Sequence, residues 1–223
     1  MCSCAATRSE DRISQASAHY QLGISYLNYD NIQPAFVEFQ KAYELDPNNK
    51  DVLDAIGLIY LLRLNDYPAA VDYFKKALKV DKNFSEASNN LGLAYEKEER
   101  FNEAIAAYKE ALSNPVYNNA EKAYNNLGRA FYRVRKYNEA IDSFKQAVMR
   151  SPDFHLPYYG LALCYNAIER YGDAAIYIKK AIEKDPAYNG DIGKARKGLN
   201  EKELHVKGPE AKDVEDLLDI MNY

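Results

Sequence analysis

The chain has 223 residues and a formal net charge of −4, from 29 Lys and Arg against 33 Asp and Glu. Hydrophobic residues make up 47% of it, enough to bury a core, so wholesale disorder is excluded. A charge balance without basic excess argues against nucleic-acid binding. No apolar run approaches the ~18 residues that a membrane-spanning helix needs. The length predicts one or two folded domains.

The first residues contain two of the three cysteines, Cys2 and Cys4, and residues 1–15 are predicted to be a tether. The third, Cys164, lies in an apolar helical stretch and is expected to be a small buried side chain. An odd number without framework spacing argues against a disulfide-stapled fold. The Cys2-Ser3 start resembles a mature bacterial lipoprotein, whose N-terminal Cys is acylated after its signal peptide is removed. The alternative is a pair of free thiols on a cytosolic protein.

Five similar segments recur between residues 16 and 188. In the first block of each, an apolar residue precedes Gly or Ala, and an aromatic residue follows three positions later. The small residues, at spacings of 34, 35, 36 and 34, are Gly23, Gly57, Gly92, Gly128 and Ala162. A second block has a small residue, a large one four later and a small one three later, which is one face of an α-helix. Its five sets are Ala35/Phe39/Ala42, Ala70/Phe74/Ala77, Ala104/Tyr108/Ala111, Ala140/Phe144/Ala147 and Ala174/Ile178/Ala181.

This pattern resembles the tetratricopeptide repeat, a helix–turn–helix unit of 34 residues. The resemblance implies an all-α fold, a right-handed superhelical solenoid of five repeats at 16–49, 50–84, 85–120, 121–154 and 155–188. Gly or Ala in helix A is expected to let helix B approach closely, and the aromatic residue three positions later to fill the gap. The second unit has one extra residue near 62–67 and the third has two near 114–119, which are predicted to lie in loops.

Helix A of each unit lines the concave side of such a solenoid, where extended binding surfaces form. Repeat positions 2, 5, 6 and 9 are expected to face this groove; they are Ser17, Tyr20, Gln21, Ile24, Asp51, Asp54, Ala55, Leu58, Glu86, Asn89, Asn90, Leu93, Lys122, Asn125, Asn126, Arg129, Leu156, Tyr159, Gly160 and Leu163. Amides repeated in adjacent units are suited to follow the backbone of an extended peptide, unless they are solvated or bond to a neighbouring helix. Arginines on the same face are expected to pair with a partner carboxylate. The candidate groove residues are Tyr20, Asn89, Asn90, Asn125, Asn126, Arg129, Arg133 and Tyr159.

After the repeats, residues 189–207 are predicted to contain a capping helix. Gly208-Pro209 then breaks the chain, and residues 208–223 form an acidic segment with apolar residues at helical spacing. Two alternatives remain for this segment: a mobile amphipathic helix that docks on a partner, or a helix folded back on the solenoid. The second is favoured.

No motif points to catalysis. His19, His155 and His205 have no metal-ligand spacing among themselves or with Cys. The sequence contains no P-loop, dinucleotide-binding turn or nucleophile elbow. The chain is therefore predicted not to be an enzyme, to use no cofactor or metal, and to bind neither a small-molecule substrate nor nucleic acid.

The junction of the third and fourth units carries Pro115-x-Tyr117 in a longer loop between Asn-Leu-Gly segments. Together with the Cys2 start and the YQLGISYL segment at 20–27, it resembles the type IV pilus biogenesis lipoproteins called pilotins. The resemblance implies a non-enzymatic lipoprotein, acylated on Cys2, that faces the periplasm from the outer membrane. There it would assist assembly or localisation of the secretin, and its groove would hold a segment of the secretin or another pilus component. The alternative is a soluble cytoplasmic scaffold or co-chaperone-like adaptor with an unrelated peptide partner.

Overall fold

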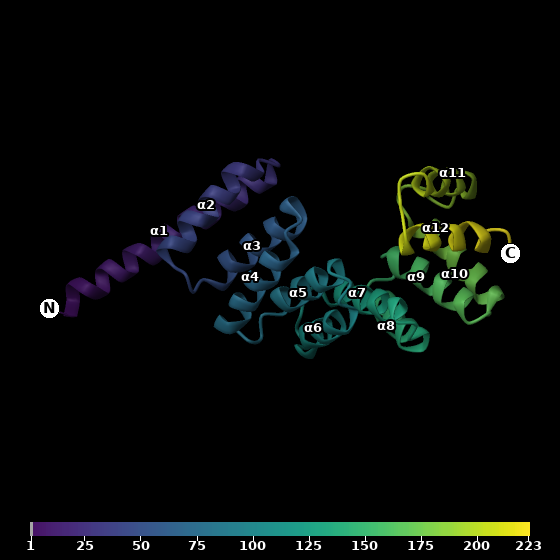
Figure 1. Ribbon diagram of the computed structural model, residues 1–223, viewed down its shortest axis with the longest axis horizontal. Helices are drawn as coiled ribbons and strands as arrows, with labels where there is room; N and C mark the ends of the chain where they lie inside the picture. Colours follow the sequence, from purple (N-terminus) through teal and green to yellow (C-terminus); the bar gives the residue numbers. More distant parts are fainter. Residues whose placement is uncertain (1) are drawn as a thin grey trace. The chain divides into compact units, whose positions relative to one another are not determined.

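A computed structural model describes the backbone of residues 2–223 and the side chains from residue 10 onward. Within these residues every regular element is helical, so the predicted all-α class of stacked helix pairs is confirmed (Figure 1). The chain divides into two compact units, Met1–Asn114 and Pro115–Tyr223, and each is described by itself.

The first unit consists of three helix pairs, each packed side by side. In chain order its elements are α1 (Cys2–Asn28), α2 (Ile32–Leu45), α3 (Lys50–Ile59), η1 (Tyr60–Leu64), α4 (Tyr67–Val80), α5 (Ser85–Lys97) and α6 (Phe101–Ser113). The second unit contains two such pairs followed by two further helices. Its elements are α7 (Ala120–Arg133), α8 (Tyr137–Arg150), α9 (Leu156–Ala167), α10 (Tyr171–Lys184), α11 (Ile192–Glu203) and α12 (Pro209–Ile220).

The helix α1 begins at Cys2, so residues 2–15, expected to form a tether, continue the first helix A without a break. The physical reason is the absence of Gly and Pro before Gly23, which leaves no residue that stops a helix. Met1 and the side chains of residues 2–9 lie outside the described residues. The predicted lipidation of Cys2 falls there.

Paired helices approach each other most closely at the Gly of helix A. A Cβ atom added at Gly92 would lie 2.5 Å from the ring of Tyr108, and one at Gly128 would lie 2.7 Å from the ring of Phe144. At the glycine itself, the ring in the gap comes from helix B. The helix-A aromatic residue also packs between the paired helices: Tyr60 stacks on Tyr73 of α4, with ring centres 5.5 Å apart.

The helix-B positions with the order small, large, small form the core of each pair. All of them are buried in the described structure: Ala35, Phe39, Ala42, Ala70, Phe74, Ala77, Ala104, Tyr108, Ala111, Ala140, Phe144, Ala147, Ala174, Ile178 and Ala181. Small residues on both sides of a ring let the next helix pack close to the backbone. The ring itself supplies most of the buried apolar area.

The extra residues of the second and third repeats are accommodated in different ways. The extra residue of the second repeat is absorbed in the π-helical segment η1, because a π-turn takes one more residue than an α-turn. Its expected place in a loop is therefore wrong. The two extra residues of the third repeat lie, as expected, between α6 and α7.

Every turn between helix A and helix B places a non-glycine residue in the left-handed region. These residues are Asp30, Asn65, Glu99, Arg135 and Glu169, with φ between 55° and 62°. At Glu169 the following amide, Arg170 N–H, donates to Tyr165 O at 2.8 Å, which closes the helix as a Schellman turn.

Replacing Glu169 with Gly is expected to raise the free energy of unfolding by about 0.5–1 kcal/mol. A side chain with a Cβ pays a conformational penalty at positive φ that Gly does not pay. Urea denaturation followed by circular dichroism measures the change. Glu169→Ala, which keeps the Cβ atom, is the matched control; an equal gain in both variants would contradict the explanation.

Candidate functional site

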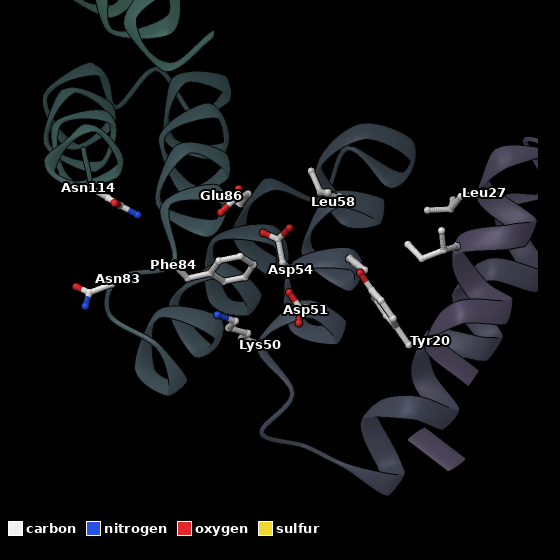
Figure 2. Close-up of a pocket in the computed structure, with 12 residues that line it drawn as sticks. Tyr20, Leu27, Lys50, Asp51, Asp54, Leu58, Asn83, Phe84, Glu86 and Asn114 are labelled. Carbon is white, nitrogen blue, oxygen red and sulfur yellow. The ribbon is translucent and has the colours of Figure 1, made fainter. Parts of the chain in front are cut away.

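A pocket of about 520 Å³ lies in the first unit between helices α1, α3 and α5 (Figure 2). Its wall on α1 carries Tyr20, Ile24 and Leu27, and its floor on α3 carries Lys50, Asp51, Asp54, Ala55 and Leu58. The far wall is built from Asn83, Phe84, Glu86 and Asn114. Because helix A of three successive repeats contributes, the pocket is a property of the stack and not of one repeat.

Asp54 lies at the floor of the pocket with 9% of its surface exposed. Its two carboxylate oxygens accept hydrogen bonds from Asn90 Nδ2 at 3.0 and 3.2 Å. Burial raises the pKa of Asp54 to about 7; the bond from Asn90 opposes this shift, while the charges of Glu86 and Asp51 add to it. The negative form of Asp54 is therefore under-compensated inside the protein and would be stabilised by a cation.

The one lysine of the pocket does not supply that cation. Lys50 Nζ lies 2.5 Å from Asp81 Oδ2, and the same ammonium lies 4.7 Å from the centre of the Phe84 ring. The hydrogen bond to Asp81 raises the pKa of Lys50. With Lys50 paired in this way, the carboxylates of Asp51, Asp54 and Glu86 set the charge of the pocket.

The opposite wall of the pocket is aromatic. Tyr20 is half-buried, its ring centre lies 5.8 Å from that of Phe39, and in Figure 2 it faces Asp51 and Asp54. Burial, followed by the nearby charges of Asp51 and Asp54, raises the pKa of the Tyr20 hydroxyl, so the ring stays neutral. Neutral aromatic faces beside carboxylates suit a cationic side chain, which is attracted by both.

Two of the three predicted groove residues of the first unit, Tyr20 and Asn90, lie in or beside this pocket. Tyr20 lines it and Asn90 bonds to the carboxylate on its floor. Asn89 is buried. All buried side-chain nitrogen and oxygen atoms of the described residues have a hydrogen-bond partner. The amide of Asn90 thus bonds to a neighbouring helix, which was the alternative to peptide contact.

The predicted groove residues of the second unit are mostly engaged within the protein. Asn125 and Asn126 are buried on α7, while Arg129 on the same helix is exposed. Arg133 forms two hydrogen bonds to the carboxylate of Asp213 on α12. The hydroxyl of Tyr159 donates to Asp185 Oδ2 at 3.0 Å. Arg133, predicted to pair with a partner carboxylate, is bound in this structure to a carboxylate of the chain's own α12.

Five pocket residues are not among those that the repeat register identifies. They lie at or beyond the ends of helices, where position numbers within a repeat carry no directional information: Leu27, Lys50, Asn83, Phe84 and Asn114. A usable signal exists for Phe84: an aromatic residue, Phe154, stands at the same place, directly before the first residue of a repeat. By contrast, Asp51, Asp54 and Glu86 follow from the register.

The side chains that line the pocket can bind a ligand through charge and through apolar contact. Among the described side chains no group of three or more His, Cys, Asp or Glu residues is arranged to hold a metal ion. Over the same part of the chain, no helix combines the length and hydrophobicity needed to cross a bilayer. The combination of carboxylates, an aromatic wall and apolar side chains is typical of a site that binds one or two side chains of an extended peptide.

Stacked helix pairs of this kind define an α-helical repeat protein. The chain belongs to the tetratricopeptide repeat family: models of this repeat match residues 16–49, 59–119 and 125–189.

Two curated proteins match parts of the chain. Type IV pilus assembly protein PilF of Pseudomonas aeruginosa is 31% identical over 100 residues, which cover 45% of this chain and 39% of PilF. Anaphase-promoting complex subunit 3 of Schizosaccharomyces pombe is 39% identical over 69 residues, which cover 31% of this chain and 10% of that protein. The chain therefore spans about two fifths of PilF and a tenth of the yeast subunit.

The fold also matches a solved structure. The crystal structure of PilW, described as a widely conserved type IV pilus biogenesis factor, superposes with a TM-score of 0.71. The superposition covers 89% of this chain and 97% of PilW at 22% sequence identity. At that identity the likeness shows a common fold.

Proposed function

We propose that this protein is a lipid-anchored assembly factor of the type IV pilus, which holds a segment of a pilus component in the pocket of its first three repeats. The observation that carries the proposal is the sequence similarity to PilF, a type IV pilus assembly protein. The Cys2-Ser3 start supports the anchor, since acylation at Cys2 would hold the protein at the outer membrane facing the periplasm. The proposed partner is the secretin, whose assembly or localisation the protein would assist.

The charged residues of the pocket indicate what kind of partner segment it would bind. Asp51, Asp54 and Glu86 lie around one cavity, and Lys50 is already paired with Asp81. A Lys or Arg side chain of the partner would compensate these charges and lie against the face of Tyr20. We therefore propose that the partner segment is extended and carries a basic residue.

Neutralising the pocket is expected to reduce partner recovery at least tenfold. The full-length protein, produced from its own gene, is captured from detergent-solubilised membranes and the bound proteins are identified by mass spectrometry. The test variant is Asp51→Asn combined with Glu86→Gln, which keeps side-chain size and removes two charges. The matched control is Asp72→Asn, which removes a charge from an exposed position on α4.

Two results would overturn the proposal separately. Recovery of the same secretin or pilus component by the double variant and by the control would place its binding outside the pocket. If the wild-type protein carries no acyl chain on Cys2, and if Cys2→Ala leaves its membrane association unchanged, the lipid anchor is excluded. The proposal is supported if the wild-type protein is acylated on Cys2 and recovers a secretin, and if the double variant no longer recovers that secretin. Such a result supports both the lipid anchor and the binding pocket.

The second candidate is a cytoplasmic repeat scaffold for an unrelated peptide. The match to Anaphase-promoting complex subunit 3 favours this candidate, because the name of that protein does not refer to pili. The same capture experiment separates the two functions. An unacylated protein that is recovered from the soluble fraction with cytosolic partners would support the scaffold.

A further inference from the structure

The acidic helix α12 lies against the last repeat of the second unit. It packs against α9, α10 and α11, and Figure 1 shows it between α11 and the α9–α10 pair. Its apolar stripe, formed by Val214, Leu217 and Ile220, is buried. The alternative of a helix folded back on the repeats therefore describes α12 in this structure.

Some polar contacts of α12 and the residues after it are made to α11, where Lys202 pairs with Glu210 and Arg196 bonds to Asn222. Two others reach the A helices of the second unit, where a ligand was expected. Arg133, one helical turn beyond Arg129 on α7, forms two hydrogen bonds to the carboxylate of Asp213. Asn166, near the end of α9, accepts a hydrogen bond from the Tyr223 hydroxyl at 2.9 Å. The ring of Tyr223 also lies edge-on to Tyr171, with 5.2 Å between ring centres. An acidic amphipathic segment is thus recognised by an arginine, an amide and an apolar surface.

The helix α12 is lightly anchored compared with the repeats beneath it. It buries three residues and α11 buries two, whereas α7 buries eight, α9 buries seven and α10 buries four. Leu204, in the segment that joins α11 to α12, is 81% exposed, and Gly208 at the start of α12 has φ of 61°. Elements with few buried apolar contacts open before the rest of a protein unfolds.

We propose that α12 is a built-in, displaceable occupant of a second partner-binding surface, formed by Arg133, Asn166 and the apolar surface of α9 and α10. The partner is a protein helix with the chemistry of α12: acidic, amphipathic, with a carboxylate opposite Arg133 and apolar residues on one stripe. Because partner and α12 need the same arginine, they compete, and α12 reduces the affinity of the free protein for that partner. This surface is separate from the pocket of the first unit and does not depend on the pilus proposal.

The test uses the full-length protein and a fluorescent peptide of residues 208–223 as the probe. Asp213→Lys with Leu217→Asp is designed to release α12 from its surface, because it reverses the ion pair and puts a charge on the buried stripe. Fluorescence anisotropy is expected to show at least tenfold tighter binding of the peptide to this variant than to the wild type. Glu215→Lys, on the exposed side of α12, is the matched control and is expected to bind the peptide as the wild type does.

A charge swap tests the specificity of the pair. Arg133→Glu with Asp213→Lys is expected to restore docking of α12, and the α12 amides of this variant are expected to exchange as slowly as those of the wild type. Equal peptide binding by the released variant, the wild type and the control would overturn the proposal.

Hydrogen exchange of the unmodified protein gives a result that does not depend on the variants. The amides of α12 are expected to exchange at least tenfold faster than those of α9, in a step that leaves α9 protected. Exchange of α12 only together with α9 would show that α12 is an integral part of the last repeat, and it would overturn the proposal even if the variants failed to fold.

Discussion

Replacing Phe144 with Ala is expected to lower the free energy of unfolding by about 3–5 kcal/mol, the usual loss for a large ring in a core that cannot collapse. Phe144 has 1% of its surface exposed. Its ring packs against Gly128 of its own repeat and Gly160 of the next, and a Cβ atom at either glycine would overlap it. The variant therefore removes the contact inside one repeat and the contact between two.

Urea denaturation of the full-length protein, followed by circular dichroism, measures this loss. Met149→Ala is the matched control, because Met149 lies on the same helix α8 and is 67% exposed; its change is expected to stay within about 0.5 kcal/mol. Because repeat stacks can unfold in more than one step, the loss is expected first in the transition of the second unit. Equal losses in the two variants would contradict the role of Phe144.

Replacing Asp54 with Asn is expected to stabilise the protein at pH 8 and to have little effect near pH 4. Burial raises the pKa of Asp54 from 3.8 to about 7 in the folded protein, so the folded state keeps a proton that the unfolded state has already released. Stability must then fall as the pH rises from about 4 to about 7, and this contribution is constant above pH 7. Asn does not titrate, and its side-chain oxygen still accepts a hydrogen bond from Asn90.

The size of the effect follows from the shift of about three pKa units, which corresponds to at most about 4 kcal/mol. Thermal or urea unfolding of both proteins between pH 4 and pH 8 measures it. Asp72→Asn on the exposed side of α4 serves as the control. A difference between wild type and Asp54→Asn that is the same at pH 5 and at pH 8 would exclude the buried carboxylate as its source.

The register of the repeat also accounts for part of the pocket. Asp54 and Asn90 lie 36 residues apart, close to one repeat, so that helix A of one unit presents its polar residue to helix A of the next. The register therefore identifies Asp51, Asp54 and Glu86 as groove residues. It does not reveal that Asn90 bonds to Asp54, because a periodic pattern gives the direction of a side chain and not its partner.

The helix pairs and their cores could be predicted from the amino-acid sequence. Gly92 and Gly128, together with the buried rings of Tyr108 and Phe144, recur at one period, and a contact within a single repeat is a local property that periodicity encodes. The position of α12, the pairing of Arg133 with Asp213 across 80 residues, and the raised pKa of Asp54 could be found only from the folded structure. These depend on which non-periodic segments cover a surface and exclude water from it, and that is a property of the assembled fold.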